Sequence, residues 1–225
     1  MLFPLHIKKL SESLFMSLKD EYKAAKEKAA LIDYSHLEKV KVSGADHIPL
    51  LHNILSNDIK TLKVGDQCMA SLLTANGRVL SLMEVTRYFD HTLLIVEENQ
   101  GDKTIELIGK YIITEDVQLE NVTKERIHIA IVGPQAKTIH DKLTEPDVIP
   151  LVCCRAGMEG YDFLFKKEIV EEKKKKLVDF GAMPISYETS EVLRIEAGVP
   201  RYGMDIDEDI LLPETGLEKH TASET

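Results

Sequence analysis

The chain has 225 residues, of which 44% are hydrophobic and 29% are charged, and its formal net charge is −10. A chain of this length forms one large domain or two small ones and needs no disulfide or metal to fold. The composition excludes collagen-like, low-complexity and wholly disordered proteins. The negative charge argues against nucleic acid as a partner, because nucleic-acid binding requires positive charge.

The cysteines and the hydropathy indicate a cytoplasmic protein. There are three cysteines, an odd number without the Cys-x-x-Cys spacing of a zinc site, which fits a reducing compartment. No apolar run reaches the ~18 residues of a membrane span. Residues 1–9 place an apolar stretch before Lys8 and Lys9, the reverse of the order in a secretory signal. We therefore expect a cytoplasmic location and no membrane partner.

The first half of the chain predicts a helix followed by alternating strands and helices. Residues 17–31 carry apolar side chains at steps of three and four, and Ser17 with Asp20 resembles a capping box. Asn76-Gly77 predicts a hairpin, because Asn-Gly tolerates the positive φ of a tight turn. The other expected elements are a strand at Val40 and Val42, a helix over 50–55, strands at 67–74, 78–87 and 92–96, and a helix over 105–112.

The second half repeats this mixture of strands and helices. We predict a fold of the α+β class, with two mixed antiparallel-sheet units, about 30–125 and 126–204, and helices on one face of each. Residues 205–225 are polar, acidic and without periodicity, so we expect them to be irregular. The expected elements are strands at 126–132, 149–155 and 160–166, and helices at 135–143, 167–180 and 187–197.

The residue patterns show none of the familiar catalytic motifs. The eight histidines are scattered, and no HExxH, GxSxG, GxxxxGK[ST] or GxGxxG sequence occurs. The run from Lys173 to Lys176 lies beside Glu171 and Glu172, which is typical of a solvated helix end. The patterns alone therefore indicate an acidic α+β protein without a metal site.

Five segments, in order along the chain, form a recognisable set of motifs. Residues 193–203 read LRIEAGVPRYG, and the other segments are residues 30–37, 39–46, 55–59 and 76–80. The first resembles the signature LR-x-EAG-x-P-x-YG of the aminomethyltransferase superfamily, to which the glycine-cleavage T-protein belongs, and the others are similar to further segments of that family. The resemblance extends over most of the chain and implies a T-protein-like folate-binding fold.

The resemblance leaves two main functions open. T-proteins usually carry two aspartates after the hairpin, where this chain has Ser81 and Leu82, so we expect no aminomethyl transfer. Residues 205–218 look more like the YgfZ-type folate-binding branch, which is associated with iron–sulfur cluster assembly and repair. That branch implies an accessory factor whose partners are iron–sulfur client or assembly proteins. The alternative is an aminomethyltransferase-like, tetrahydrofolate-dependent one-carbon transferase of the glycine cleavage system.

A third possibility, a folate domain fused to a dehydrogenase, lacks any dinucleotide-binding motif here. YgfZ-type proteins also carry a KGC loop and a C-terminal barrel, and this chain stops at Thr225, where that loop would begin. We therefore expect residues 1–204 to form the folate-binding region. Residues 205–225 would be an irregular linker toward a missing C-terminal barrel.

The resemblance implies that Glu196, from the EAG signature, holds the pterin ring of tetrahydrofolate or a related reduced folate. A carboxylate accepts hydrogen bonds from both the ring N3–H and the 2-amino group. Glu196 also fits an ordinary helix-surface glutamate paired with Arg194 or Arg201. No catalytic or metal-binding residue is expected. The remaining expected folate-binding residues are Tyr202, Arg201, Arg78, Gly77 and Asn57, with an arginine meeting the anionic glutamate tail of the folate.

Overall fold

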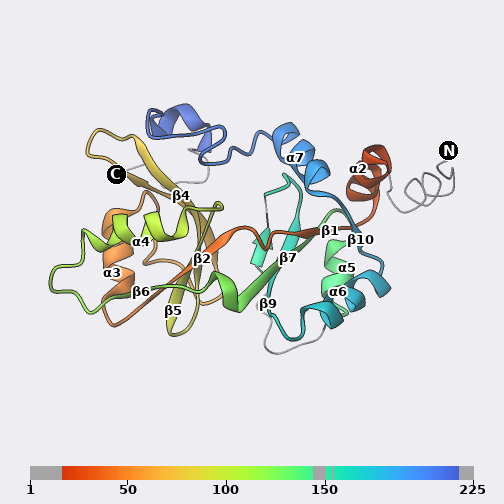
Figure 1. Ribbon diagram of the computed structural model, residues 1–225, viewed down its shortest axis with the longest axis horizontal. Coiled ribbons are helices and arrows are strands. Elements are labelled where there is room, and N and C mark those ends of the chain that lie inside the picture. The colour runs from red at the N-terminus through yellow and green to blue at the C-terminus, as the bar shows by residue number, and fades with distance from the viewer. Residues whose placement is uncertain (1–16, 144–150, 154, 218–225) are drawn as a thin grey trace, which may run out of the picture.

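The computed structural model describes residues 17–143, 151–153 and 155–217, which form two five-stranded sheets (Figure 1). In the first sheet, every neighbouring pair is antiparallel except β1 and β10, which are parallel. Its strand order is β10 (Met183–Pro184), β1 (Ala30–Asp33), β7 (Arg126–Val132), β9 (Gly160–Lys166) and β8 (Leu151–Cys153).

The second sheet is antiparallel throughout. Its edge strand before Gly77 forms a hairpin with the neighbouring strand after it, and the φ of Gly77 is +81°, as the Asn-Gly sequence predicts. The two sheets confirm the predicted α+β class. The strand order is β3 (Gln67–Leu73), β4 (Val79–Arg87), β5 (His91–Val96), β2 (Glu38–Ser43) and β6 (Gln118–Asn121).

Helices cover both faces of the first sheet and one face of the second. One hydrophobic core contains side chains from both sheets. It holds Ala25, Ile32 and Leu193, which lie on or against the first sheet, together with Leu93 and Ile95 of β5 in the second sheet. This core joins the two sheets, which lie side by side in Figure 1. The helices are α3 (His47–Ile54) and α4 (Gly101–Gly109) on the second sheet, α5 (Ala136–His140) and α6 (Val170–Asp179) on one face of the first, and α2 (Leu18–Glu27) with α7 (Tyr187–Glu196) on its other face.

The helix predicted over 17–31 is shorter than expected. The Ser17 hydroxyl does cap it by accepting a hydrogen bond from the Asp20 amide, but the helix ends at Glu27. From Ala30 the chain is the buried strand β1, whose side chains are covered on both faces and so lack the alternation that marks an exposed strand. By sequence β1 belongs to the predicted unit 30–125, but it lies in the sheet built mainly by residues after 125. The division into units at about residue 125 stays a prediction.

Residues 205–217 are irregular apart from one 3₁₀ turn, Leu212–Thr215. They lie along the β3–β4 hairpin, where the Leu212 amide donates to the Gly77 carbonyl (3.1 Å) and the Val79 amide donates to the Ile210 carbonyl (3.0 Å). In Figure 1 this segment runs from α7 to the β4 side of the molecule. Its linker role stays a prediction, and residues 218–225 lie outside the described part. None of the described helices is both long and apolar enough to cross a membrane.

Candidate functional site: a pocket between the sheets and α7

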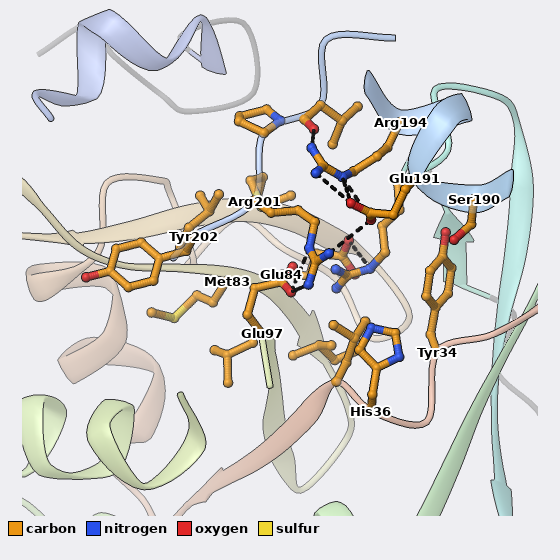
Figure 2. A pocket seen from close by; sticks show the side chains of 18 of the residues that line it. Tyr34, His36, Met83, Glu84, Glu97, Ser190, Glu191, Arg194, Arg201 and Tyr202 are labelled. Carbon is orange, nitrogen blue, oxygen red and sulfur yellow. Dashed lines mark hydrogen bonds and ion pairs between the residues drawn. The ribbon is translucent and has the colours of Figure 1, made fainter. Parts of the chain in front are cut away.

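A pocket lies where the two sheets meet α7 (Figure 2). The turn between β1 and β2, strands β4 and β5, and the loop after α7 supply its walls. Its cavity volume is about 50 Å³, which is room for only a few water molecules. Its polar wall consists of three carboxylates, three guanidinium groups, three phenols and an imidazole: Glu84, Glu97, Glu191, Arg155, Arg194, Arg201, Tyr34, Tyr187, Tyr202 and His36.

Helix α7 is held against α2 by a buried glutamate. The Ser186 hydroxyl accepts a hydrogen bond from the Thr189 amide, which caps the helix. Glu21 of α2 in turn accepts hydrogen bonds from the Ser186 amide (2.9 Å), the Ser186 hydroxyl (2.5 Å) and the Thr189 hydroxyl (2.5 Å). Burial by itself would raise the pKa of Glu21, but these hydrogen bonds lower it. The carboxylate therefore fixes the start of the helix that forms one wall of the pocket.

Arg201 connects the two sides of the pocket. Its Nε and Nη2 donate to the Glu97 carboxylate at the end of β5, at 2.9 and 2.6 Å. Its Nη1 donates to Glu191 of α7 at 3.0 Å and also to the Tyr187 hydroxyl. Figure 2 shows the guanidinium between the two carboxylates. The Arg201 side chain therefore fills much of the space that a ligand would need.

Arg194 orders the loop that carries Arg201. Its Nε and Nη2 donate to Glu191, the shorter contact being 2.7 Å, and its Nη1 donates to Asp205 at 2.7 Å and to the Val199 carbonyl at 3.2 Å. Burial alone would raise the pKa of Glu191, but the hydrogen bond from Arg194 and the charges of Arg201 and Arg194 lower it. Glu191 is therefore ionised at neutral pH.

Deeper in the pocket, Glu84 of β4 pairs with Arg155. The ion pair is 2.9 Å long, and the side chains are only 8% and 14% exposed. Gln67 donates a further hydrogen bond to Glu84 at 2.8 Å. Burial raises the pKa of Glu84, and the Arg155 charge opposes that rise. Near this pair, His128 and Asp162 form a fully buried pair at 3.0 Å, so the junction of the sheets contains a cluster of buried ionisable side chains.

The turn between β1 and β2 brings Tyr34 and His36 to the pocket. The ring of His36 meets the ring of Tyr187 edge-on, with centroids 5.3 Å apart. Burial lowers the pKa of His36, so the imidazole is neutral at pH 7. The buried Lys39 ammonium holds the turn by donating to the Leu37 carbonyl at 2.6 Å and the Ser35 carbonyl at 3.3 Å.

Lys39 gives the first testable prediction. Burial, helped by the Arg155 charge, lowers the pKa of the Lys39 ammonium to about 8, whereas the unfolded chain has a lysine pKa of about 10.4. Between these values the unfolded chain binds the extra proton, so this side chain adds stability as pH rises. The free energy of unfolding of the wild type, minus that of Lys39→Met, should therefore grow between about pH 8 and pH 10. Urea unfolding across this range tests this, and a constant difference would contradict it.

The structure brings two of the six predicted folate-binding residues to this pocket. Arg201 and Tyr202 line it, and the Tyr202 side chain is buried. Gly77 and Arg78 lie in the hairpin turn, where Arg78 pairs with Asp209 at 2.9 Å. The Asn57 amide donates to the Met69 carbonyl at 2.9 Å and so supports a neighbouring strand. Ligand contacts of all six residues stay predictions.

Glu196 lies outside this pocket, on the exposed end of α7. Its carboxylate forms an ion pair with Lys26 at 2.9 Å and accepts hydrogen bonds from the Tyr22 hydroxyl at 2.9 and 3.0 Å. Its partners therefore come from α2 and are not Arg194 or Arg201. Lys26 also lines a second, wider groove beside α5 and the β8–β9 turn. The volume of this groove is about 610 Å³.

Several pocket residues were not predicted from the sequence. Glu97, Glu191 and Arg155 come from distant parts of the chain, and no local pattern links them. Glu84 did carry a signal, because it is a carboxylate within the otherwise mainly apolar strand Val79–Arg87. A buried carboxylate in such a strand requires a buried partner, which is Arg155.

The fold and the pocket define a two-sheet α+β protein with a polar pocket between its sheets. The chain belongs to the GCVT N-terminal domain family, whose model matches residues 3–152. Relatives include the aminomethyltransferases of Bacillus mycoides (strain KBAB4) and Bacillus cytotoxicus, each 29% identical over 227 residues. These matches cover 90% of this chain and 62% of each relative, so the chain spans less than two thirds of their length.

The fold is shared with a solved aminomethyltransferase. The crystal structure of the glycine cleavage system aminomethyltransferase T from Bartonella henselae superposes with a TM-score of 0.78 at 20% sequence identity. The superposition covers 86% of this chain and 58% of that one. These comparisons confirm the T-protein-like fold and the family. They do not distinguish the YgfZ-type branch from the others.

Proposed function

We propose that the pocket between the sheets and α7 binds a reduced folate. The observation that carries the proposal is a carboxylate-lined pocket, closed by Arg201, in a chain of the GCVT N-terminal domain family. A pterin ring needs a carboxylate opposite its adjacent N–H donors, and Glu97 and Glu191 are available for this. The apolar residues Leu37, Ile95 and Val199 line the same pocket and suit a flat ring.

Methionine-methyl NMR tests where the ligand binds. Met69 and Met83 line the pocket, whereas Met158 lines the second groove near Glu196. Titration with 5-formyltetrahydrofolate, a stable reduced folate, should shift the methyl signals of Met69 and Met83. The signal of the exposed Met204 serves as a reference. The absence of any shift at saturating ligand would overturn the proposal.

The expectation for Glu196 gives a different result in the same titration. If Glu196 anchors the pterin, Met158 should shift, and Glu196→Gln should bind about tenfold more weakly or worse, since the pair loses its charge. If the pocket binds the ligand, Glu196→Gln should bind like the wild type. Calorimetry on both proteins separates these outcomes.

Two roles follow from folate binding, and both are proposals for the whole protein. The relatives named aminomethyltransferase favour tetrahydrofolate-dependent one-carbon transfer, which is the better supported role. Ser81 and Leu82 favour a non-catalytic accessory factor in iron–sulfur cluster assembly or repair, because both are buried and neither is a base at neutral pH. The proposed location for either role is the cytoplasm. Formation of methylenetetrahydrofolate from an aminomethyl-lipoyl carrier and tetrahydrofolate supports the first role, and folate binding without it supports the second.

A further inference from the structure

We infer that Arg201 is an internal occupant of the ligand site, and that Glu97 recognises the guanidine-like edge of the pterin when Arg201 leaves. This inference rests on the proposed folate binding and assigns the pterin anchor. It makes Glu97 a specificity-determining residue and Arg201 the group that the ligand displaces.

The geometry of the Glu97 contact supports the assignment. Two adjacent N–H groups of Arg201 converge on one Glu97 oxygen, at 2.9 and 2.6 Å, and the side chains are only 15% and 11% exposed. The 2-amino group and N3–H of a pterin are also two adjacent donors on one flat, conjugated unit. A carboxylate aimed at a guanidinium is therefore also aimed at that edge of a pterin.

The size of the pocket requires a displacement. The space of about 50 Å³ is far below the roughly 300–1,000 Å³ of ligand sites. Arg201 is the side chain that spans the pocket from β5 to α7, so its departure opens the space between Glu97 and Glu191. When Arg201 leaves, the Glu97 carboxylate can accept hydrogen bonds from the ligand instead.

The backbone of Arg201 allows its side chain to move alone. Its amide donates to the Asp205 carboxylate at 2.8 Å, and its carbonyl accepts from the Asp205 amide at 2.9 Å. Asp205 is in turn held by Arg194 at 2.7 Å. These bonds fix the main chain, so a swing of the side chain leaves the loop in place. The displaced guanidinium then lies near the rim, where it meets the anionic tail of a folate.

The test uses the tail-free probe 6-methyltetrahydropterin, so that contacts with the glutamate tail do not contribute. Calorimetry compares the wild-type chain with Glu97→Gln, Arg201→Ala and the control Glu98→Gln, whose side chain is exposed and outside the pocket. We expect Glu97→Gln to bind at least about tenfold more weakly and Arg201→Ala about tenfold more tightly than the wild type. Glu98→Gln should match the wild type.

The double variant Arg201→Ala/Glu97→Gln should lose the gain of Arg201→Ala, because the freed carboxylate is absent. If circular dichroism shows Arg201→Ala to be unfolded, Arg201→Lys replaces it, since lysine cannot present two fixed donors to one oxygen. Tighter binding by the lysine variant is then the expected result.

Two outcomes overturn the inference in distinguishable ways. If 5-formyltetrahydrofolate binds the wild type but the pterin binds Glu97→Gln and Glu98→Gln equally, Glu97 is not the anchor, and the proposed folate binding stands. If neither ligand binds the wild type or Arg201→Ala, both the inference and the proposed function are wrong.

Discussion

Replacing Arg155 by methionine should lower the free energy of unfolding by about 3–5 kcal/mol, because it leaves the Glu84 carboxylate buried without its partner. The matched control is Arg78→Met. Arg78 also pairs with an aspartate at 2.9 Å, but these side chains are 46% and 91% exposed. An exposed pair is worth less than about 1 kcal/mol, so the control should lose little stability. Urea unfolding of the three proteins at pH 7 measures the effects, and equal losses would contradict the prediction.

The same variant should regain part of its stability in acid. The Arg155 charge opposes the burial that raises the pKa of Glu84, so removing it lets that pKa rise further. Between the unfolded glutamate pKa of about 4.3 and the higher folded value, the folded protein binds more protons than the unfolded chain. Stability therefore increases as pH falls from 7 to 5. The gain should disappear in Arg155→Met/Glu84→Gln, which has no carboxylate to protonate.

Phe163→Ala should lower the free energy of unfolding by about 3–5 kcal/mol, since it empties a large volume in the core of the first sheet. Phe163 is fully buried, and its ring stacks on that of Phe165 with centroids 5.5 Å apart. Phe89→Ala is the matched control, because Phe89 is 92% exposed. The control should change stability by less than about 0.5 kcal/mol. Thermal or urea unfolding that gives the two variants similar midpoints would show that Phe163 does not support this core.

Local patterns in the sequence were sufficient where one segment determines its own structure. Asn76-Gly77 predicts its hairpin because the turn needs positive φ, and Ser17 predicts a helix start because its hydroxyl satisfies a free amide. The pattern fails at Ala30, where the chain becomes a strand. That residue is a strand because β7 and β10 lie on either side of it, and neither neighbour is visible in the local sequence.

The candidate site could be predicted only in part for the same reason. The signature at 193–203 draws attention to Arg201 and Tyr202, and both line the pocket. It draws equal attention to Glu196, whose position near the end of α7 directs it toward Lys26. The contact between Arg201 and Glu97 joins residues 104 apart in sequence, so it depends on the packing of both sheets. No spacing rule within the chain encodes such a contact.

The position of β1 between β10 and β7 determines the order in which the first sheet can form during synthesis. Ala30 pairs with Val132 on one side and with Met183 on the other. β1 therefore leaves the ribosome long before its partner strands β7 and β10 are synthesised. The strands β2 to β6, which form the second sheet, follow one another directly in the sequence. Because loop closure over such distances is slow, the second sheet should form first and leave β1 unpaired until β7 has emerged, and paired on one side only until Met183 has followed. A nascent chain stopped before β7 therefore exposes the apolar side chains of β1, which the folded protein buries on both faces of the first sheet.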